Sequence, residues 1–236
     1  MFRTKLKRIL ALTLAFSMIL SATAFAASSK SKTQNNMFFG RYEQDGNLLN
    51  GAEPIEWIVV MNDGTKAMLM SKYILDNVPY LHDYANVPWE TSDLRSWMNG
   101  TFYASAFTDQ EKAMILDTYN QNPDSTQFYG VGLPGGNPTN DKVFALSVYE
   151  AQMLFGAAPE AVQDWNAKMQ AQTTPYAQLK GCWTHPRSRR GFWWLRSPGT
   201  SYGIWASTVQ DHGGVIGHVG NQAGEGARPV IWVRLQ

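Results

Sequence analysis

Two aromatic-rich segments near the C-terminal end constrain the fold of this chain more than any other feature. The first runs from Gly191 to Gly199 (GFWWLRSPG) and the second from Gly226 to Trp232 (GARPVIW). Both have the β-branched and aromatic composition of strands, and the glycine-rich turn at 211–214 (DHGG) between them predicts a hairpin. We therefore expect a compact antiparallel sheet whose last strand, Arg228 to Leu235, returns to the core beside the first strand of this set.

The N-terminal segment has the layout of a secretory signal. Four basic residues precede an apolar run from Ile9 to Leu20, and Ala24 to Ala26 supplies the small residues at which a signal peptidase cuts. The run is shorter than the roughly 20 residues that a membrane-spanning helix needs. The sequence thus predicts a signal peptide over residues 1–26, cleaved after Ala26, a flexible spacer over 27–36 and a single domain over 37–236. The expected location is extracellular.

Removal of that signal changes the charge of the chain. The whole sequence has 20 Lys and Arg against 19 Asp and Glu, and without the four basic residues of the signal the balance is 16 against 19, a net charge of −3. This balance lacks the basic surface that nucleic-acid binding requires. The basic cluster of Arg187, Arg189 and Arg190 is interpreted as a solvated loop. We expect a glycan or a surface protein as the partner, with no nucleic acid and no membrane insertion.

Large aromatic side chains are expected to build the core. Cys182 is the only cysteine and cannot form an internal disulfide, so we interpret it as a buried small hydrophobic residue. Arginines in apolar strands need a carboxylate or backbone carbonyls when they are buried. The residues to which the sequence assigns a structural role are Trp57, Trp97, Trp193, Trp194, Arg196 and Arg228.

The rest of the chain alternates strands, short helices and long polar loops. Strand composition marks residues 38–43, 54–61, 66–71 and 141–146. Capping residues predict helices that follow Ser92, Thr108 and Ser147, and residues 159–172 are predicted to form another. Asn99-Gly100 and Gly156 are predicted to end two of these helices. The fold class expected is α+β: a twisted, mostly antiparallel sheet with two or three helices and long loops at 117–140 and 173–190.

Several segments together resemble an uncharacterised family of secreted bacterial domains. The likeness rests on FGRY, EWIV, WET, LRSW, DKVF, WWLRSPG and RPV, found at residues 39–42, 56–59, 89–91, 94–97, 141–144, 193–199 and 228–230. That family is similar to a branch of the C-type-lectin-like fold shared with the formylglycine-generating enzymes, because a Trp-rich strand, a Gly-turn hairpin and a closing Arg-containing strand occur in this order. The resemblance implies a scaffold whose long loops carry the binding surface, and it implies no catalytic residue.

The function predicted from these features is a secreted, non-catalytic recognition module. Indole and phenol rings near the loops are the candidate ligand contacts, because such rings stack on sugar faces and peptide surfaces. These candidates are Tyr129, Trp183, Tyr202 and Trp205. One alternative is a cell-surface hydrolase or oxidase that uses Asp124, Asp141, Asp211 or His212 as acid or base. Another alternative is a purely structural or assembly domain.

Metal and cofactor motifs are incomplete in this sequence. Residues 130–135 (GVGLPG) have dinucleotide-binding spacing, but Pro134 and Pro138 prevent the helix that must follow. The four histidines lack the close spacing of a zinc site. The resemblance also implies a copper-holding cysteine pair or the calcium motifs of sugar-binding lectins, and neither is complete here. We expect no cofactor; a calcium site, as the alternative, would use Asp124, Asn137 or Asp141.

Overall fold

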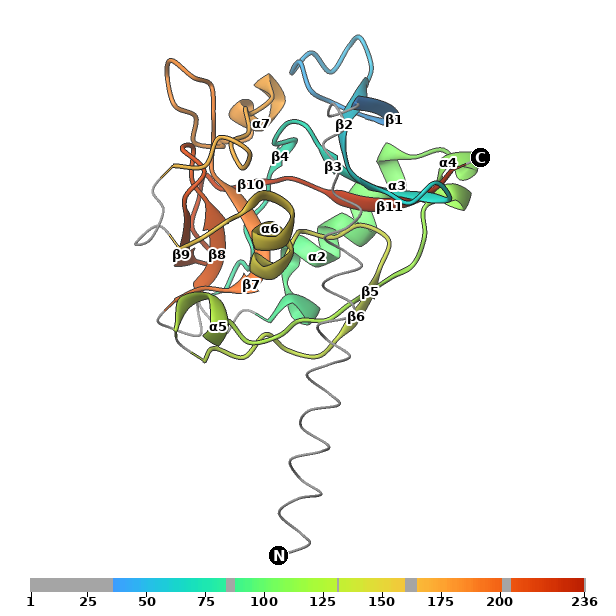
Figure 1. Ribbon diagram of the computed structural model, residues 1–236. Helices are drawn as coiled ribbons and strands as arrows, with labels where there is room; N and C mark the ends of the chain where they lie inside the picture. The colour runs from blue at the N-terminus through green and yellow to red at the C-terminus, as the bar shows by residue number, and fades with distance from the viewer. Residues whose placement is uncertain (1–35, 84–87, 131, 160–164, 201–204, 236) are drawn as a thin grey trace, which may run out of the picture. The chain divides into compact units, whose positions relative to one another are not determined.

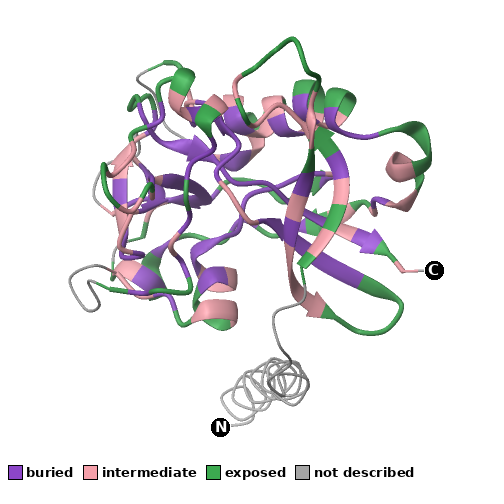
Figure 2. Ribbon diagram, turned by 90° about the horizontal axis from the view of Figure 1, so that it is seen from above, coloured by how far each residue is buried: buried purple, intermediate pink, exposed green. Residues whose placement is uncertain are grey.

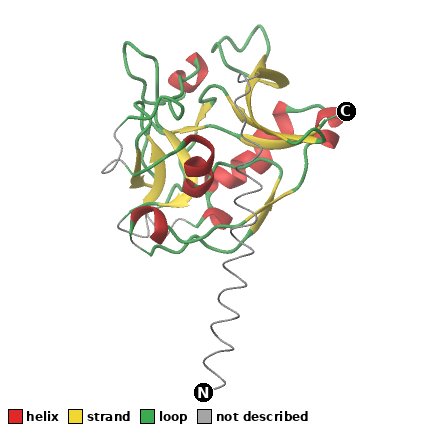
Figure 3. Cartoon of the chain, viewed as in Figure 1, coloured by secondary structure: helices red, strands yellow, loops and turns green. Residues whose placement is uncertain are grey.

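The computed structural model describes residues 36–83, 88–130, 132–159, 165–200 and 205–235 (Figure 1). The predicted signal peptide, most of the spacer and the candidate ligand contact Tyr202 lie outside the described residues. Within the described part, strands and short helices share the chain with long loops (Figure 3). The α+β class predicted from the sequence is confirmed.

A four-stranded antiparallel sheet joins the start and the end of the described chain. Its strand order is β1 (Asn36–Tyr42), β2 (Glu53–Asn62), β3 (Lys66–Ser71) and β11 (Val230–Arg234). The β2–β3 turn is tight because the Oδ1 atom of Asp63 accepts the backbone N–H groups of Thr65 and Lys66, each at 2.9 Å. These strand boundaries agree with the sequence-based ones to within two residues.

The Trp-rich segment belongs to a second sheet, so the expectation of one sheet is wrong. This sheet has the order β4 (Asp76–Asn77), β10 (Gly226–Ala227), β7 (Trp193–Pro198), β8 (Trp205–Val209) and β9 (Val215–Val219). The predicted β8–β9 hairpin is present. After β10 the chain crosses to the first sheet, because Pro229 has no N–H group with which to continue the ladder. A separate pair consists of β5 (Thr118–Asn120) and β6 (Thr139–Asp141).

The helices are short, and most begin at the caps that the sequence predicts. Ser92 accepts the N–H of Arg95 at 3.1 Å, and Thr108 and Ser147 form complete capping boxes with the glutamates three residues later. Gly156 adopts the left-handed conformation, with φ of 72°, and ends its helix as predicted. The helices are α2 (Asp93–Trp97), α3 (Tyr103–Ala106), α4 (Asp109–Met114), α5 (Thr126–Tyr129), α6 (Val148–Phe155) and α7 (Pro175–Leu179).

Other predicted boundaries are wrong. Asn99 and Gly100 do not end a helix: the chain continues through a π-helical turn (Met98–Phe102) into α3. The Asn99 side chain instead bonds the backbone of 142–143 from both of its polar atoms, and Phe102 is fully buried.

The predicted helix over 159–172 is absent from residues 165–172. There, Asn166 donates its backbone N–H to the carbonyl of His212 at 3.0 Å, which ties the segment to the β8–β9 hairpin. The irregular stretch predicted after it contains α7. The predicted strand over 141–146 is in strand conformation at Asp141, the last residue of β6.

Buried residues, purple in Figure 2, run through the centre of the ribbon, and the largest of them are mostly aromatic. Trp57, Trp193 and Trp194 are fully buried, and each indole N–H donates to a backbone carbonyl at 2.6 to 3.1 Å. Trp97 is half-buried, with its ring centroid 5.1 Å from that of Phe102. A buried indole removes a large apolar area from water, and its hydrogen-bonded N–H avoids the cost of burying an unpaired donor. These rings therefore supply much of the stabilisation in a chain that has no disulfide.

The Cys182 thiol is expected to be unreactive in the folded protein. It is buried against the carbonyl of Asp76, and burial together with the carboxylates of Asp76 and Glu225 raises its pKa. Because alkylation requires the thiolate, iodoacetamide at about pH 8 should modify the native chain at least ~100-fold more slowly than the chain unfolded in concentrated urea. Mass spectrometry over time measures both rates. Equal rates would contradict this placement of Cys182.

Candidate functional site

A groove of about 410 Å³ lies between the first sheet and the segment that leads into α7. Phe38 of β1 and three residues of β2 form part of its wall, and residues 172–175 and Arg189 form another part. The β2 residues are Glu53, Pro54 and Glu56. In Figure 1 the light-blue loop after β1 and the orange α7 lie near the top of the view. The groove is therefore built from segments that are more than 100 residues apart in the sequence.

Rings and prolines give the groove an apolar lining. Phe38 is 67% exposed although it lies in a strand, and the half-buried Tyr73 follows β3. Pro54 and Pro175 add two further rigid apolar surfaces. A ring this exposed on a strand offers most of its surface to a ligand.

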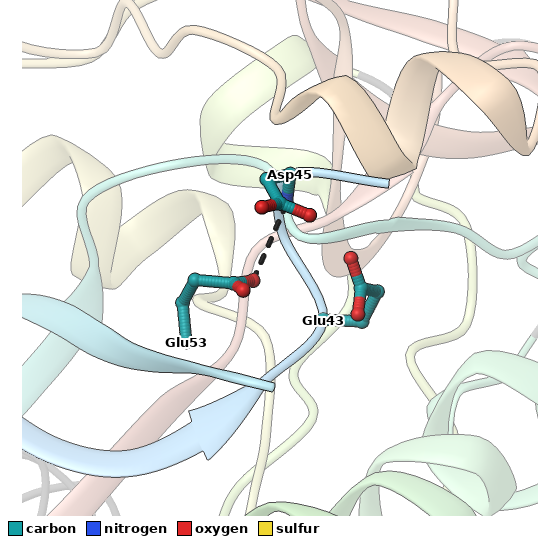
Figure 4. A group of neighbouring side chains, drawn as sticks. All are labelled: Glu43, Asp45 and Glu53. Carbon is teal, nitrogen blue, oxygen red and sulfur yellow. Dashed lines mark hydrogen bonds between the residues drawn. The ribbon is translucent and has the colours of Figure 1, made fainter. Parts of the chain in front are cut away.

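Three acidic side chains cluster beside the groove, and two of them, Asp45 and Glu53, line it. One carboxylate oxygen each of Glu43, Asp45 and Glu53 lies within 4.8 Å of the others (Figure 4). Glu53 Oε2 accepts the N–H groups of Gln44 at 2.7 Å and Asp45 at 3.3 Å. The backbone N–H of Asn47 and the side chain of Asn50 lower the pKa of Asp45, so its carboxylate stays ionised at neutral pH. Among the described residues, none of these three carboxylates has an ion-pair partner.

Arg189 reaches the groove from the segment after α7. It has a φ of 60°, and it is the only non-glycine residue with positive φ in the described part of the chain. A left-handed arginine costs roughly 1–2 kcal/mol relative to glycine at the same place. One guanidinium nitrogen donates to Gln178 Oε1 at 2.6 Å, and no carboxylate among the described residues pairs with it. An unpaired cation thus shares the groove with unpaired carboxylates.

Backbone hydrogen bonds hold the two sides of the groove together. Tyr176 donates its N–H to the carbonyl of Gln44 at 2.9 Å, which attaches α7 to the loop after β1. Gly46, with φ of 82°, packs so closely that a Cβ there would lie 2.5 Å from Leu179 Cδ1. Thr173 donates its N–H to the carbonyl of Arg189 at 3.0 Å. The groove is consequently a preformed feature of the fold.

The aromatic ligand candidates from the sequence lie elsewhere. Tyr129 is half-buried and donates its hydroxyl to Ser207 Oγ at 3.0 Å, and burial raises its pKa. Trp205 is half-buried in β8. Trp183 is 42% exposed, and its ring centroid lies 4.6 Å from that of Phe192. None of these three lines the groove.

The calcium candidates are each engaged with different protein groups. Asp141 is buried and accepts hydrogen bonds from the side chains of four residues, at 2.6 to 3.0 Å: Trp89, Arg95, Asn120 and Thr139. Asp124 accepts the N–H of Thr126 at 3.0 Å, and Asn137 donates its side-chain amide to Glu90 at 2.9 Å. The oxygens of Asp141 are therefore used by the protein, and it serves as a structural carboxylate.

The proposed acid or base groups Asp211 and His212 lie in the β8–β9 turn. His212 Nδ1 accepts the N–H of Gly214 at 3.1 Å, which is a contact within the turn. Neither residue lines the groove.

The two buried arginines are held in different ways. Arg196 forms a two-point pair with Glu150, in which its second terminal nitrogen is 2.8 Å from Glu150 Oε1. Arg228 instead donates from Nε to the carbonyl of Ser71 at 2.9 Å, and its guanidinium lies 4.8 Å from the ring centroid of Trp193. Burial lowers the pKa of Arg228 to about 9. Both arginines connect segments of the scaffold, and neither lines the groove.

A second pair of titratable groups lies outside the groove. His218 of β9 pairs through Nδ1 with Oε1 of the buried Glu225, while Glu225 Oε2 has no hydrogen-bond partner among the described residues. Phe192 lies next to His218, with ring centroids 6.0 Å apart.

Residues 64–235 match the family described as a domain of unknown function, DUF6273. The chain belongs to this family. The match agrees with the predicted resemblance to an uncharacterised domain, and it covers Tyr73, residues 172–175 and Arg189 of the groove. Phe38, Asp45 and the β2 wall precede the matched DUF6273 region.

Comparison with curated proteins and with solved structures gives no match. None of the described helices is long and apolar enough to span a membrane.

The groove was not predicted from the sequence. Its rings stand in a strand (Phe38) and directly after one (Tyr73), where sequence patterns assign them to packing. The sequence offered one signal for this site: the acidic residues Glu43, Asp45 and Glu53 lie close to one another and to an aromatic residue, Phe38.

Substitution of Asp141 by Asn should destabilise the fold strongly. The change removes a charge that pairs with Arg95 and places an amide among donors, so the free energy of unfolding should fall by about 3 kcal/mol. Urea titration followed by tryptophan fluorescence measures this. Asp124→Asn is the matched control, because Asp124 is exposed and should cost less than ~1 kcal/mol. Equal effects of the two variants would contradict the structural role of Asp141.

Proposed function

We propose that this protein is an exported, non-catalytic recognition module that binds a glycan or a surface protein through the groove between β1–β2 and α7. The observation that carries this proposal is the preformed groove itself, lined by an exposed ring, prolines and charged groups. A cavity of this volume is in the range of small-molecule and saccharide sites. The long-loop binding surface implied by the resemblance is, in this proposal, the loop after β1 together with residues 172–190.

Export is supported by the signal-like segment over residues 1–26. It precedes the start of the matched DUF6273 region. The buried single cysteine and the ring-based core also suit a chain that works outside the cell without a disulfide.

The C-type-lectin-like relation is part of the same proposal. Two features of the topology support it. The Trp-rich β7 is followed by the glycine-turn hairpin β8–β9 and then by the closing strand β11, and β11 returns to the sheet formed by β1, β2 and β3. This order places the ends of the described chain in one sheet and leaves the intervening loops to form a surface.

The chemistry of the groove suits recognition better than catalysis. Phe38 and Tyr73 offer ring surfaces for stacking, and exposed carboxylates accept hydrogen bonds from hydroxyl or ammonium groups. The Glu53 and Asp45 oxygens already accept backbone N–H groups, which hold both carboxylates in place. The contacts with Asn47 and Asn50 also lower the pKa of Asp45. Carboxylates held in this way offer a ligand acceptor atoms at fixed positions.

Variants of the groove rings test this proposal against the sequence-based candidates. The purified chain is screened against cell-wall polysaccharides, glycan arrays and secreted proteins, and the affinity of the best ligand is measured by calorimetry. Phe38→Ala and Tyr73→Ala should each weaken binding about tenfold, as the loss of one stacked ring predicts. Trp183→Ala, an exposed ring outside the groove, is the control and should leave the affinity unchanged.

Two outcomes would count against the proposal. Absence of any saturable binding would remove the recognition function. If Trp183→Ala abolishes binding and Phe38→Ala leaves the affinity unchanged, the binding site lies at the aromatic residues that the sequence alone predicts.

A further inference from the structure

We infer that the groove takes a dipolar peptide: an extended segment with a basic group that meets the acidic side of the groove and an acidic group that meets Arg189. This inference rests on the proposed function and specifies its ligand class. Among the described residues, the groove combines carboxylates without an ion-pair partner, an arginine without one and an apolar surface.

The negative side consists of Asp45 and Glu53. Both line the groove, and neither has a cationic partner among the described residues. Glu56, which also lines the groove, differs: Lys72 Nζ lies 2.8 Å from its Oε2, so its charge is already neutralised within the protein. Two carboxylates therefore remain to attract a cationic group, such as a lysine or arginine side chain or a peptide amino terminus.

The positive side is Arg189. A guanidinium has five N–H donors, and Gln178 Oε1 accepts from one terminal nitrogen. The neutral amide partner leaves the positive charge uncompensated and the other donors free for a carboxylate. The arginine also keeps a left-handed backbone conformation that glycine would adopt at lower cost, and its own side-chain contact in the fold is one exposed hydrogen bond.

The apolar part of the groove favours a peptide over a neutral glycan. Phe38, Tyr73, Pro54 and Pro175 are the apolar residues of the lining, and they suit side chains and extended backbone. A neutral sugar could form an ion pair neither with the carboxylates nor with the guanidinium. Leu179 of α7 and Leu49 of the loop after β1 are 74% and 97% exposed, and they extend an apolar surface on the two segments that flank the groove.

A charge-resolved peptide screen tests this inference. The purified chain is exposed to a positional-scanning tetrapeptide library, and the neutral oligosaccharides of the glycan array serve as the competing class. We expect enrichment of sequences in which Lys or Arg stands near Asp or Glu. Glu53→Gln keeps an oxygen that accepts the N–H groups of Gln44 and Asp45, and it should reduce the preference for basic residues about tenfold.

Arginine variants give the matched comparison for the positive side. Arg189→Gln should reduce the preference for acidic residues about tenfold, whereas Arg187→Gln, an exposed arginine of the same segment that does not line the groove, should change nothing. Arg189→Gly should lose the same preference while its melting temperature stays the same or rises, because glycine relieves the left-handed conformation. A variant that keeps its melting temperature but loses the preference for acidic residues would show that the Arg189 side chain acts in binding and not in folding.

The outcomes distinguish this inference from the proposed function. Binding of neutral oligosaccharides that depends on Phe38, without charge preference among peptides, would overturn the dipolar ligand and keep the recognition module. A charge preference that Glu53→Gln and Arg189→Gln leave unchanged would also overturn it. No binding of either class would overturn both.

Discussion

The buried carboxylate of Asp141 is the interaction on which the rest of this structure depends. It accepts hydrogen bonds from Trp89, Arg95, Asn120 and Thr139, which belong to the turn before α2, to α2 itself, to β5 and to β6. A single charged group thus joins the turn before α2 and α2 itself to the β5–β6 pair. Since a buried charge is tolerated when every acceptor site is filled, this cluster is specific as well as stabilising.

Buried arginines repeat this principle at other junctions. Arg196 connects β7 with α6 through Glu150, and Arg228 connects the crossing between the two sheets with the backbone of Ser71 and the ring of Trp193. Short helices and loops of this length bury little apolar surface by themselves. In this protein, buried charged and indole groups with satisfied hydrogen bonds therefore hold the segments together. Disulfides or long helices and strands have this role in other small domains.

The groove stands in contrast to this scaffold because its charges are not paired within the described chain. Arg196 and Asp141 are buried with partners, whereas Asp45, Glu53 and Arg189 are accessible without ionic ones. The same residue types therefore have two roles in one protein. Solvent exposure and pairing, rather than residue identity, separate the structural charges from those that we propose bind a ligand.

The sequence by itself determined the features that depend on neighbouring residues. The caps at Thr108 and Ser147 and the β8–β9 hairpin were predicted, because their hydrogen bonds join residues that are close together in the sequence. Tertiary structure decided the separation into two sheets, the role of Asp141 and the groove. Asp141 meets Trp89 across 52 positions, and the groove combines Phe38 with Arg189. No local pattern encodes such contacts, because they arise only when packing of the buried rings brings distant segments together.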